Sequence, residues 1–506
     1  MKKRIIPLLL ALSLAFSVPV FALNAEDFKQ GQLSGVTSAA DGAMLVTDTF
    51  NKVIWRVKDD KVTQYAGTIS VADLSGEPTA VYHDAVADKA FFMEPWDIEP
   101  FLDGYAITDA AAHVVRYIAG GRVYTLAGSN QVGKTDGAGK NALFDRPTGL
   151  AADADGGLYV ADAGNGNIRR IAKDGKVTTV ASGLAAPTGI CWYDGALYVA
   201  ETGRSRIVRI ASGRVEAFAG VSEATEDVDE YLGGYVDGPA AAAKFDHPQG
   251  IAAGSDGTIY VADTGNSAVR SISGGRVYTL ARGASGAPMP PSPRGMRISG
   301  DTLYVADRFA GSILALSIAK KAYADVPANA WFADAVATAT QRGISNGSTA
   351  TRFEPDTAIN RAMFVTMLSR VHQNTDGSVI IDGNSSLSDL ADAQWFTASA
   401  RWAIDAGIVT GDNGRFAPSR GINREEMATM LYRYAIMRGL DTSATSEKLE
   451  TLADAGEVSP WALDAVRWAC ANGILNGIDG KLAPKATATR AQAAKMLVEF
   501  MDACEL

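Results

Sequence analysis

The chain has 506 residues, of which 47% are hydrophobic and 21% are charged. These values exclude a disordered or collagen-like chain, and at about 150 residues per domain the length predicts about three domains, or one large domain with a smaller module. The net charge of −10 argues against a nucleic-acid-binding protein, which needs a basic face to displace counterions from phosphate.

The N-terminus has the features of a secretory signal peptide. Basic residues precede the apolar run 5–21, and small residues follow at Ala22 and Ala25. This order of charge, apolar run and small residues is typical of a cleavable signal. An uncleaved signal anchor is the alternative, because the run is near the lower length limit for a membrane span. We therefore expect residues 1–22 to be removed and the mature protein to be secreted without a transmembrane span.

A repeat of predicted strands extends from residue 33 to about 318. Each copy contains Pro-x-Gly-apolar, a turn, an apolar-Tyr-Val-Ala-Asp strand and a further strand near Ile-x-Arg-Ile, and most copies continue into another strand. The period-two alternation is typical of half-buried strands, and the 51 glycines supply many turns. Six copies of four strands predict a six-bladed all-β propeller. Clear copies begin at Pro147, Pro187 and Pro248, and weaker ones at Leu33, Pro95 and Pro293.

One acidic residue marks the same point in every copy. Because these acids recur in all six repeats, we interpret them as structural residues in turns and not as catalytic carboxylates. The marker acids are Asp48, Asp109, Asp162, Glu201, Asp263 and Asp307.

An enzyme would need one repeat to differ from the others for a chemical reason. Only His83, His113 and His247 offer such a difference. Three histidines can bind Zn²⁺, but their spacing does not support a site. The sequence also lacks a Gly-rich phosphate loop, a nucleophile elbow and an HExxH motif. We therefore predict no catalytic residues, no metal and no cofactor.

The repeats resemble the NHL repeat family over nearly all of residues 33–318. The resemblance implies a propeller at 25–320 whose loops bind an unknown protein or small ligand. Related propellers include lyases and lactonase-like hydrolases with metal-held centres, so a surface-tethered enzyme with a metal at the central channel is the alternative. The sixth copy ends at Ile318 without a fourth strand. Because an open sheet edge invites aggregation, we expect residues 28–33 to supply that strand.

From residue 322 the pattern changes from strands to helices. In each of three aligned units, glycines end one predicted helix, and a short extended segment leads into a second helix. The units are similar to S-layer homology (SLH) domains. The resemblance implies an α-helical module with a pseudo-threefold arrangement that binds secondary cell wall polymer, an anionic glycan linked to peptidoglycan. The predicted SLH domains span residues 321–375, 385–440 and 449–506.

An arginine stands in the first turn of the second helix of each unit. A cation there opposes the helix dipole, which indicates an external anion, since helix N-termini and guanidinium groups both bind carboxylate or phosphate. The SLH resemblance implies the same role, with a polysaccharide that is often pyruvylated. An internal partner such as Asp325, Asp389 or Asp454 is the alternative. Met363 and Gln492 replace the Glu of the family motif, so the three sites need not bind equally. The arginines are Arg361, Arg424 and Arg490.

The five tryptophans after residue 322 fall into two groups, those inside predicted helices and those before them. Trp402 and Trp468 lie inside predicted helices, so we expect them in the core. The other three either stack on sugar rings or pack in the core, and both interpretations stay open; we carry them as candidate polymer-binding residues. A bridge between Cys470 and Cys504 also stays open. The three candidate binding tryptophans are Trp331, Trp395 and Trp461.

Together these features predict a multidomain, non-enzymatic protein of the bacterial cell wall or S-layer. Its SLH domains would hold it non-covalently on the anionic polymer, and its propeller would face outward to bind a partner. Neither the polymer's chemistry nor the propeller's ligand follows from the residues, because one fold hosts many functions.

Overall fold

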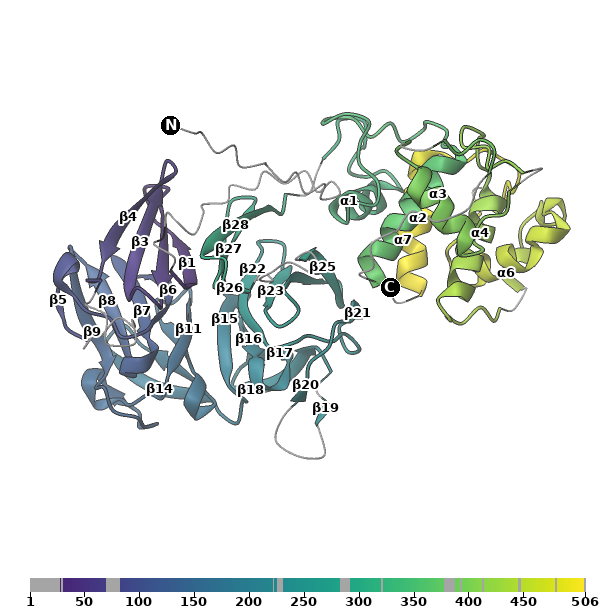
Figure 1. Cartoon of the computed structure of the whole chain (residues 1–506). Coiled ribbons are helices and arrows are strands. Elements are labelled where there is room, and N and C mark those ends of the chain that lie inside the picture. Colours follow the sequence, from purple (N-terminus) through teal and green to yellow (C-terminus); the bar gives the residue numbers. More distant parts are fainter. Residues whose placement is uncertain are drawn as a thin grey trace, which may run out of the picture. The chain divides into compact units, whose positions relative to one another are not determined.

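We describe the protein from a computed structural model. The described residues are 28, 31–69, 82–221, 223–224, 231–282, 292–319, 322–376, 387–391, 394–411, 414–444, 447–477 and 480–504. The predicted signal peptide, residues 1–22, lies outside them. The chain divides into two compact units, and the division falls between Ala319 and Lys320. The first unit contains the strands and the second the α-helices, many of which are labelled in Figure 1.

The first unit is a six-bladed β-propeller, as predicted. Each blade is an antiparallel sheet whose main strands, three or four in number, follow one another in the order of the chain from the innermost outward. The innermost strands are β1 (Leu33–Ser38), β6 (Pro95–Phe101), β11 (Pro147–Ala152), β15 (Pro187–Tyr193), β22 (Pro248–Ala253) and β26 (Pro293–Ser299). The second strands are β2 (Met44–Asp48), β7 (Gly104–Asp109), β12 (Leu158–Asp162), β16 (Ala196–Glu201), β23 (Ile259–Asp263) and β27 (Thr302–Asp307).

The outer half of each blade is less uniform than the inner half. The third strands are β3 (Val53–Lys58), β8 (Val114–Ala119), β13 (Asn167–Ile171), β17 (Arg206–Ala211), β24 (Ala268–Ser273) and β28 (Ser312–Ser317). The fourth strands are β4 (Lys61–Ala66), β9 (Arg122–Gly128), β14 (Lys176–Ala181), β18 (Arg214–Ala219) and β25 (Arg276–Arg282). Three blades gain a short fifth strand, namely β5 (Ala85–Val86), β10 (Gly137–Ala138) and β21 (Gly238–Pro239). A separate pair is formed by β19 (Glu223–Ala224) and β20 (Tyr231–Leu232).

Short 3₁₀ helices fill several connections of the chain. Three of them, η2, η4 and η5, directly follow the marker acids at the ends of the second strands. They are η1 (Ala87–Lys89), η2 (Ala110–Ala112), η3 (Gly139–Asn141), η4 (Ala163–Asn165), η5 (Thr202–Arg204), η6 (Ala455–Glu457) and η7 (Pro460–Ala462).

The inner strands pack side by side in a closed ring. The order is β1, β6, β11, β15, β22 and β26, and β26 returns to β1. Glycine at the third position of five of these strands permits the close approach, because a Cβ on Gly295 would lie 2.1 Å from the carbonyl oxygen of Ser34. A Cβ on Gly149 would likewise lie 2.2 Å from the carbonyl oxygen of Thr188. The recurring Pro-x-Gly motif therefore closes the ring.

The predicted fourth strand of the sixth blade is wrong. Within the described residues the sixth sheet has three strands, β26, β27 and β28. Phe28 instead enters a hydrophobic core shared by the first and sixth blades, where its ring packs edge-on against Trp55 of the first blade at 6.4 Å between centroids. Asn51 donates from Nδ2 to the carbonyl oxygen of Phe28 at 3.2 Å. Among the described residues before β1, Phe28 therefore packs on the first blade and none forms a strand with the sixth; residues 29–30 lie outside the described part of the chain.

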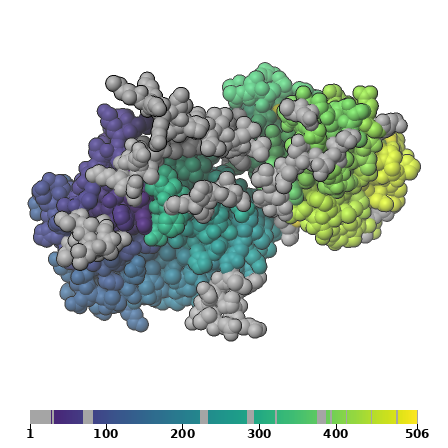
Figure 2. All heavy atoms as spheres, in the orientation of Figure 1, coloured from purple at the N-terminus to yellow at the C-terminus, as the bar shows by residue number. Residues whose placement is uncertain are grey.

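The second unit contains seven α-helices within the described residues, arranged as three helical repeats. The first helix of each repeat packs on the second helix of the repeat before it in a cyclic order: α3 on α2, α6 on α4, and α1 on α7. The space-filling view shows the unit as one packed body, coloured from green to yellow (Figure 2). The helices are α1 (Ala333–Gln341), α2 (Arg361–Asp376), α3 (Thr397–Asp405), α4 (Arg424–Met437), α5 (Glu447–Glu450), α6 (Leu463–Ala471) and α7 (Arg490–Ala503).

A ring of backbone hydrogen bonds gives this unit its pseudo-threefold arrangement. Ile359 N–H donates to the Ala488 carbonyl at 2.9 Å, Ala488 N–H to the Ile422 carbonyl at 2.8 Å, and Ile422 N–H to the Ile359 carbonyl at 3.2 Å. The three side chains are buried in one hydrophobic core that includes residues from all three repeats. The repeats therefore depend on one another for their packing.

Candidate functional site

The arginine at the start of each second helix binds backbone carbonyls of the next repeat. Arg361 donates from Nε to the carbonyl oxygen of Phe416 at 2.9 Å and from Nη2 to that of Thr410 at 3.4 Å. Arg424 makes the same two bonds to Leu482 (2.8 Å) and Asn476 (2.7 Å). In a third copy of this arrangement, Arg490 reaches back from the last repeat to Phe353 (2.8 Å) and Asn346 (2.6 Å) of the first.

These bonds account for part of what the sequence attributed to an external anion. Carbonyl dipoles of the neighbouring repeat stabilise each guanidinium against the opposing helix dipole. Burial lowers the pKa of Arg424 and of Arg490. Within the described residues, Nη1 of these two arginines donates no hydrogen bond, which leaves one edge of each guanidinium for a ligand.

The three predicted internal carboxylates have a different task. Asp325 accepts hydrogen bonds from the backbone N–H groups of Phe353 and Glu354, both at 2.8 Å. Asp389 and Asp454 do the same for the corresponding loops of their repeats. These bonds lower the pKa of all three aspartates despite the opposing effect of partial burial. Each aspartate thus holds the segment to which an arginine from another repeat also binds.

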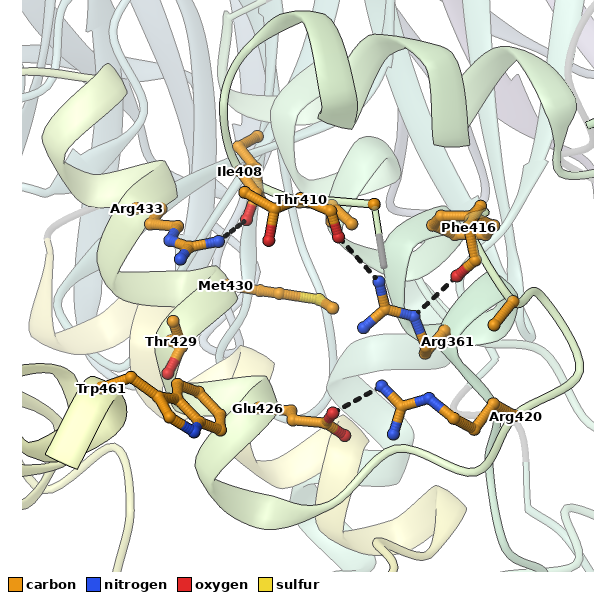
Figure 3. A pocket seen from close by; sticks show the side chains of 13 residues that line it. Arg361, Ile408, Thr410, Phe416, Arg420, Glu426, Thr429, Met430, Arg433 and Trp461 are labelled. Carbon is orange, nitrogen blue, oxygen red and sulfur yellow. Dashed lines mark hydrogen bonds and ion pairs between the residues drawn. The ribbon is translucent and has the colours of Figure 1, made fainter. Parts of the chain in front are cut away.

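A pocket of about 500 Å³ lies where three repeats meet. Arg361 comes from the first repeat, residues 408–411, 416–417 and helix α4 from the second, and Trp461 from the third (Figure 3). The pocket is lined by Arg361, Ile408, Val409, Thr410, Gly411, Phe416, Ala417, Arg420, Glu426, Thr429, Met430, Arg433 and Trp461.

The pocket carries an excess of positive charge on a chain whose net charge is −10. Its only acidic side chain among the lining residues, Glu426, binds Arg420 Nη2 at 2.6 Å and the backbone N–H of Asn423 at 3.0 Å. Arg433 donates to the carbonyl oxygen of Ile408 at 3.4 Å. With Glu426 neutralised by Arg420, the charges of Arg361 and Arg433 favour an anionic ligand.

The three tryptophans carried as binding candidates are all exposed, so the core-packing interpretation is wrong for them. Their exposed fractions are 56% for Trp331, 62% for Trp395 and 58% for Trp461. Exposed indole rings offer flat apolar faces that suit the C–H surface of a sugar. The expectation for the two remaining tryptophans is met, because Trp468 is fully buried and Trp402 packs against the core on His372.

The corresponding positions of the three repeats differ in charge. Arg433 corresponds to Arg370 in the first repeat and to Glu499 in the third, where Glu499 binds Lys495 at 2.6 Å. Arg420 corresponds to Thr357 and Ala486. The sequence flagged only Met363 and Gln492 as departures. The positions around helix α4 therefore carry the most arginines of the three repeats, with Glu426 offsetting one of them.

The marker acids of the propeller are structural, as interpreted from the sequence. Each accepts a backbone N–H from the segment before the inner strand of its own blade; Asp162, for example, accepts from Asp145 at 2.7 Å. Asp162 also binds Arg169 Nη1 at 2.9 Å, and both side chains are fully buried. Arg169 continues to Asp136 at 2.7 Å. The sequence did not reveal this second partner, because a variable connection supplies it.

The remaining sequence candidates in the propeller do not form a site. His113 accepts from the backbone N–H of Arg146 at 3.1 Å, and His247 binds Asp246 at 2.5 Å. Among the described residues, no group of three or more His, Cys, Asp or Glu side chains is placed to hold a metal ion. All three cysteines, Cys191, Cys470 and Cys504, are free thiols. No helix in the described part of the chain has the length and apolar character needed to cross a membrane.

Family comparisons match both units. The S-layer homology domain matches at residues 322–363, 387–428 and 451–494, the NHL repeat at 144–171 and the teneurin NHL domain at 179–273. The chain is an NHL-type propeller followed by three SLH domains. The exposed tryptophans, the arginines and the pocket of helix α4 therefore all belong to the SLH module.

Curated relatives match over somewhat more than a third of the chain. The amylopullulanase of Thermoanaerobacterium thermosulfurigenes is 31% identical over 185 residues, which are 36% of this chain and 10% of the relative. The S-layer protein sap of Bacillus anthracis is 27% identical over 190 residues, 38% of this chain and 22% of the relative. The chain thus spans between a tenth and about a fifth of these two relatives. With its SLH domains it is a secreted, cell-wall-associated protein.

Solved structures resemble the chain over somewhat more than half of its length. A protein of unknown function from Bacteroides thetaiotaomicron has a TM-score of 0.43 and 18% identity, with 57% of this chain and 69% of that one covered. Virginiamycin B lyase from Staphylococcus aureus has a TM-score of 0.40 and 16% identity, with 59% and 99% covered. At these values the likeness supports no inference about activity.

Proposed function

We propose that the three SLH domains hold the mature protein non-covalently on an anionic secondary cell wall polymer, and that the propeller is displayed outward to bind a partner. SLH domains in general bind cell wall polymers. The observation that carries the proposal is the pocket of helix α4, where the Arg361 guanidinium and the exposed Trp461 ring line one basic cavity built from three repeats. In this arrangement an arginine binds the anionic group of the polymer and an indole ring binds the face of a sugar.

Binding at each pocket needs a charged and a flat apolar contact at once. A guanidinium binds a carboxylate or phosphate through charge-assisted hydrogen bonds. The half-exposed tryptophan ring can cover a sugar ring while its polar edge stays in water. Three such pockets on one module raise the effective concentration of each for a repeating polymer, so weak single contacts give durable retention.

The tryptophans provide a cleaner test of this site than the arginines. Trp331, Trp395 and Trp461 are more than half exposed, so their replacement leaves the core intact, whereas each arginine also connects two repeats. We expect the triple variant W331A/W395A/W461A of the full mature chain to unfold at the parental temperature. Its retention on purified cell wall sacculi should fall by about tenfold or more, because three linked contacts are lost together.

Ile436→Ala provides the matched control. Ile436 is 54% exposed on helix α4 and does not line the pocket, so this variant should sediment with sacculi as the parent does. Parental retention of the triple tryptophan variant would contradict the proposed site.

We propose that the protein is not an enzyme. The alternative, a tethered hydrolase or lyase with a metal at the central channel, needs a set of ligating side chains. Within the described residues no such set is present. The rings of His113 and His247 bind the backbone of Arg146 and the Asp246 carboxylate, and His83 pairs through its backbone with Phe91. Metal analysis of the purified mature chain tests this directly, since a stoichiometric Zn²⁺ or Ca²⁺ ion would favour the enzyme.

A further inference from the structure

An arginine reaches across the inside of the propeller ring without an anionic partner. Arg294 is the second residue of β26, and its guanidinium carbon lies 3.5 Å from the centroid of the Trp96 ring. Trp96 is the second residue of β6. Since β1 separates β26 from β6 in the ring, the contact crosses the interior. It lies at the end of the ring where the inner strands begin.

The Arg294 guanidinium is buried but not satisfied. The residue is only 4% exposed. Its Nε donates to Oε1 of Gln249 at 2.8 Å, whereas Nη1 is buried and has no hydrogen-bond partner. No carboxylate of the described residues forms an ion pair with it. Burial lowers its pKa to about 9, which leaves the group charged at neutral pH. A buried cation without a counter-ion is costly to keep, and the cost points to a use outside folding.

The neighbouring charges increase the demand for an anion. The charges of Arg308 and Arg146 both disfavour the charged form of Arg294, and only Glu94 favours it. Glu94 is already paired with Arg146 at 3.1 Å. Arg308 donates to Gln32 Oε1, a neutral acceptor, at 3.1 Å. Three arginines and one carboxylate therefore converge at this end of the ring in a chain that is acidic as a whole.

A second arginine of β26, Arg297, also reaches β6, and its guanidinium is paired with a carboxylate. Arg297 lies three residues further along β26 and binds Glu99 of β6 at 2.8 Å. The two arginines thus make parallel contacts between the same two strands, one with a carboxylate and one with an indole ring. The difference isolates Arg294 as the cation whose counter-ion the described residues do not supply.

We propose that the propeller binds a small ligand through an oxyanion group, a carboxylate or a phosphate, at the cluster formed by Trp96, Gln249, Arg294 and Arg308. Arg294 supplies the buried charge and the unsatisfied N–H, and Arg308 supplies a second guanidinium beside it. The Trp96 ring and Gln249 hold the Arg294 guanidinium in place, so its orientation is set before the ligand arrives. This site is in the propeller and is independent of the SLH pockets.

Titration of the full mature chain with inorganic phosphate or with acetate, at constant ionic strength, tests the proposal. Tryptophan fluorescence reports binding because Trp96 lies against the guanidinium, and W96F assigns the signal. We expect saturable binding of at least one probe, and the tighter probe identifies a phosphate or a carboxylate ligand. In R294Q the half-saturating concentration should rise by about tenfold or more, since charge-assisted bonds are lost.

Two further variants separate binding from folding. Arg308 is only partly buried, so R308Q should fold normally and still raise the half-saturating concentration by about threefold, because one nearby positive charge is removed. Arg214, 81% exposed at its side chain on the outer strand β18, gives the matched control R214Q, which should bind as the parent does. The proposal is overturned if neither probe binds saturably, if R294Q and R308Q bind like the parent, or if R214Q loses as much affinity as R294Q.

Discussion

Arg361 donates from Nε to the carbonyl oxygen of Phe416 at 2.9 Å, and this bond links the first SLH domain to the second. The same bond recurs from Arg424 to Leu482 and from Arg490 to Phe353, so the arginines close a cycle of three. A residue proposed to bind the polymer is therefore also part of the module's framework. Polymer binding and the packing of the repeats are linked through one side chain.

Arg361→Ala should destabilise the SLH module. The side chain is 7% exposed and donates two hydrogen bonds to another repeat. Its removal leaves buried carbonyls unsatisfied, which costs about 2–4 kcal/mol of unfolding free energy. Urea denaturation of the mature chain, followed by far-UV circular dichroism, measures the loss in the helical transition.

Arg420→Ala is the matched control for this loss. Its side chain is 50% exposed and pairs with Glu426 at the surface. Such pairs contribute about 0–1 kcal/mol. Equal losses in the two variants would show that Arg361 does not connect the domains as the contacts indicate.

Asp162→Ala should destabilise the propeller by about 3–5 kcal/mol, because it leaves the fully buried Arg169 with only the half-exposed Asp136 in place of its fully buried carboxylate partner. The variant also removes the acceptor of the Asp145 N–H. Thermal unfolding of the strand-rich transition measures the effect. Asp155→Ala, in an exposed turn of the same blade, should shift the transition little; a comparable shift would argue against a structural role for the marker acids.

The propeller should lose stability as pH rises from about 4 to 7, the interval between the unfolded and the folded pKa of Asp97. Burial raises the pKa of Asp97 from 3.8 to about 7, although hydrogen bonds from Leu150 and Ile98 oppose the shift and Glu99 and Arg297 lie nearby. Between these two pKa values the folded state holds a proton that the unfolded state releases. Stability from this group is therefore present at low pH and is lost as pH rises, by at most about 1.4 kcal/mol per pH unit.

The variant D97G tests this assignment, because glycine occupies the corresponding position of the other five repeats. Differential scanning calorimetry across the pH range should show a smaller decline in the propeller transition of D97G than in that of the parent. An equal decline of the propeller transition in D97G and the parent would show that a group other than Asp97 causes the pH dependence.

Reductant should not change either unfolding transition. Cys191, Cys470 and Cys504 are free thiols, and burial raises the pKa of each. Alkylation of the denatured, unreduced mature protein should therefore add three groups, detectable by mass spectrometry. Incorporation of one group would instead reveal a bridge between two of the cysteines.

The repeats in the sequence were sufficient to predict the six blades and the three helical domains. Pro-x-Gly and the marker acids recur because each blade repeats the same local contacts, such as that of Asp162 with the Asp145 N–H. Trp331, Trp395 and Trp461 were found by the same periodicity, although periodicity alone left their exposure undecided. Local pattern thus identified the elements and most of the candidate residues.

Contacts between residues far apart in the chain could not be predicted from the sequence. Arg490 binds Phe353 across 137 positions, and nothing near either residue indicates the other. The wrong prediction for residues 28–33 has the same origin. The missing strand suggested that this segment joins the sixth blade, whereas the Phe28 ring packs on Trp55 of the first blade. Arg294 escaped notice because its meaning depends on Trp96 in another blade.

Co-sedimentation of the unmodified mature protein with cell wall sacculi, before and after removal of the secondary polymer, tests the central claim most directly. The account predicts that the protein pellets with intact sacculi and stays in the supernatant once the polymer has been stripped. Equal pelleting with stripped and intact sacculi, or no pelleting with either, would contradict it.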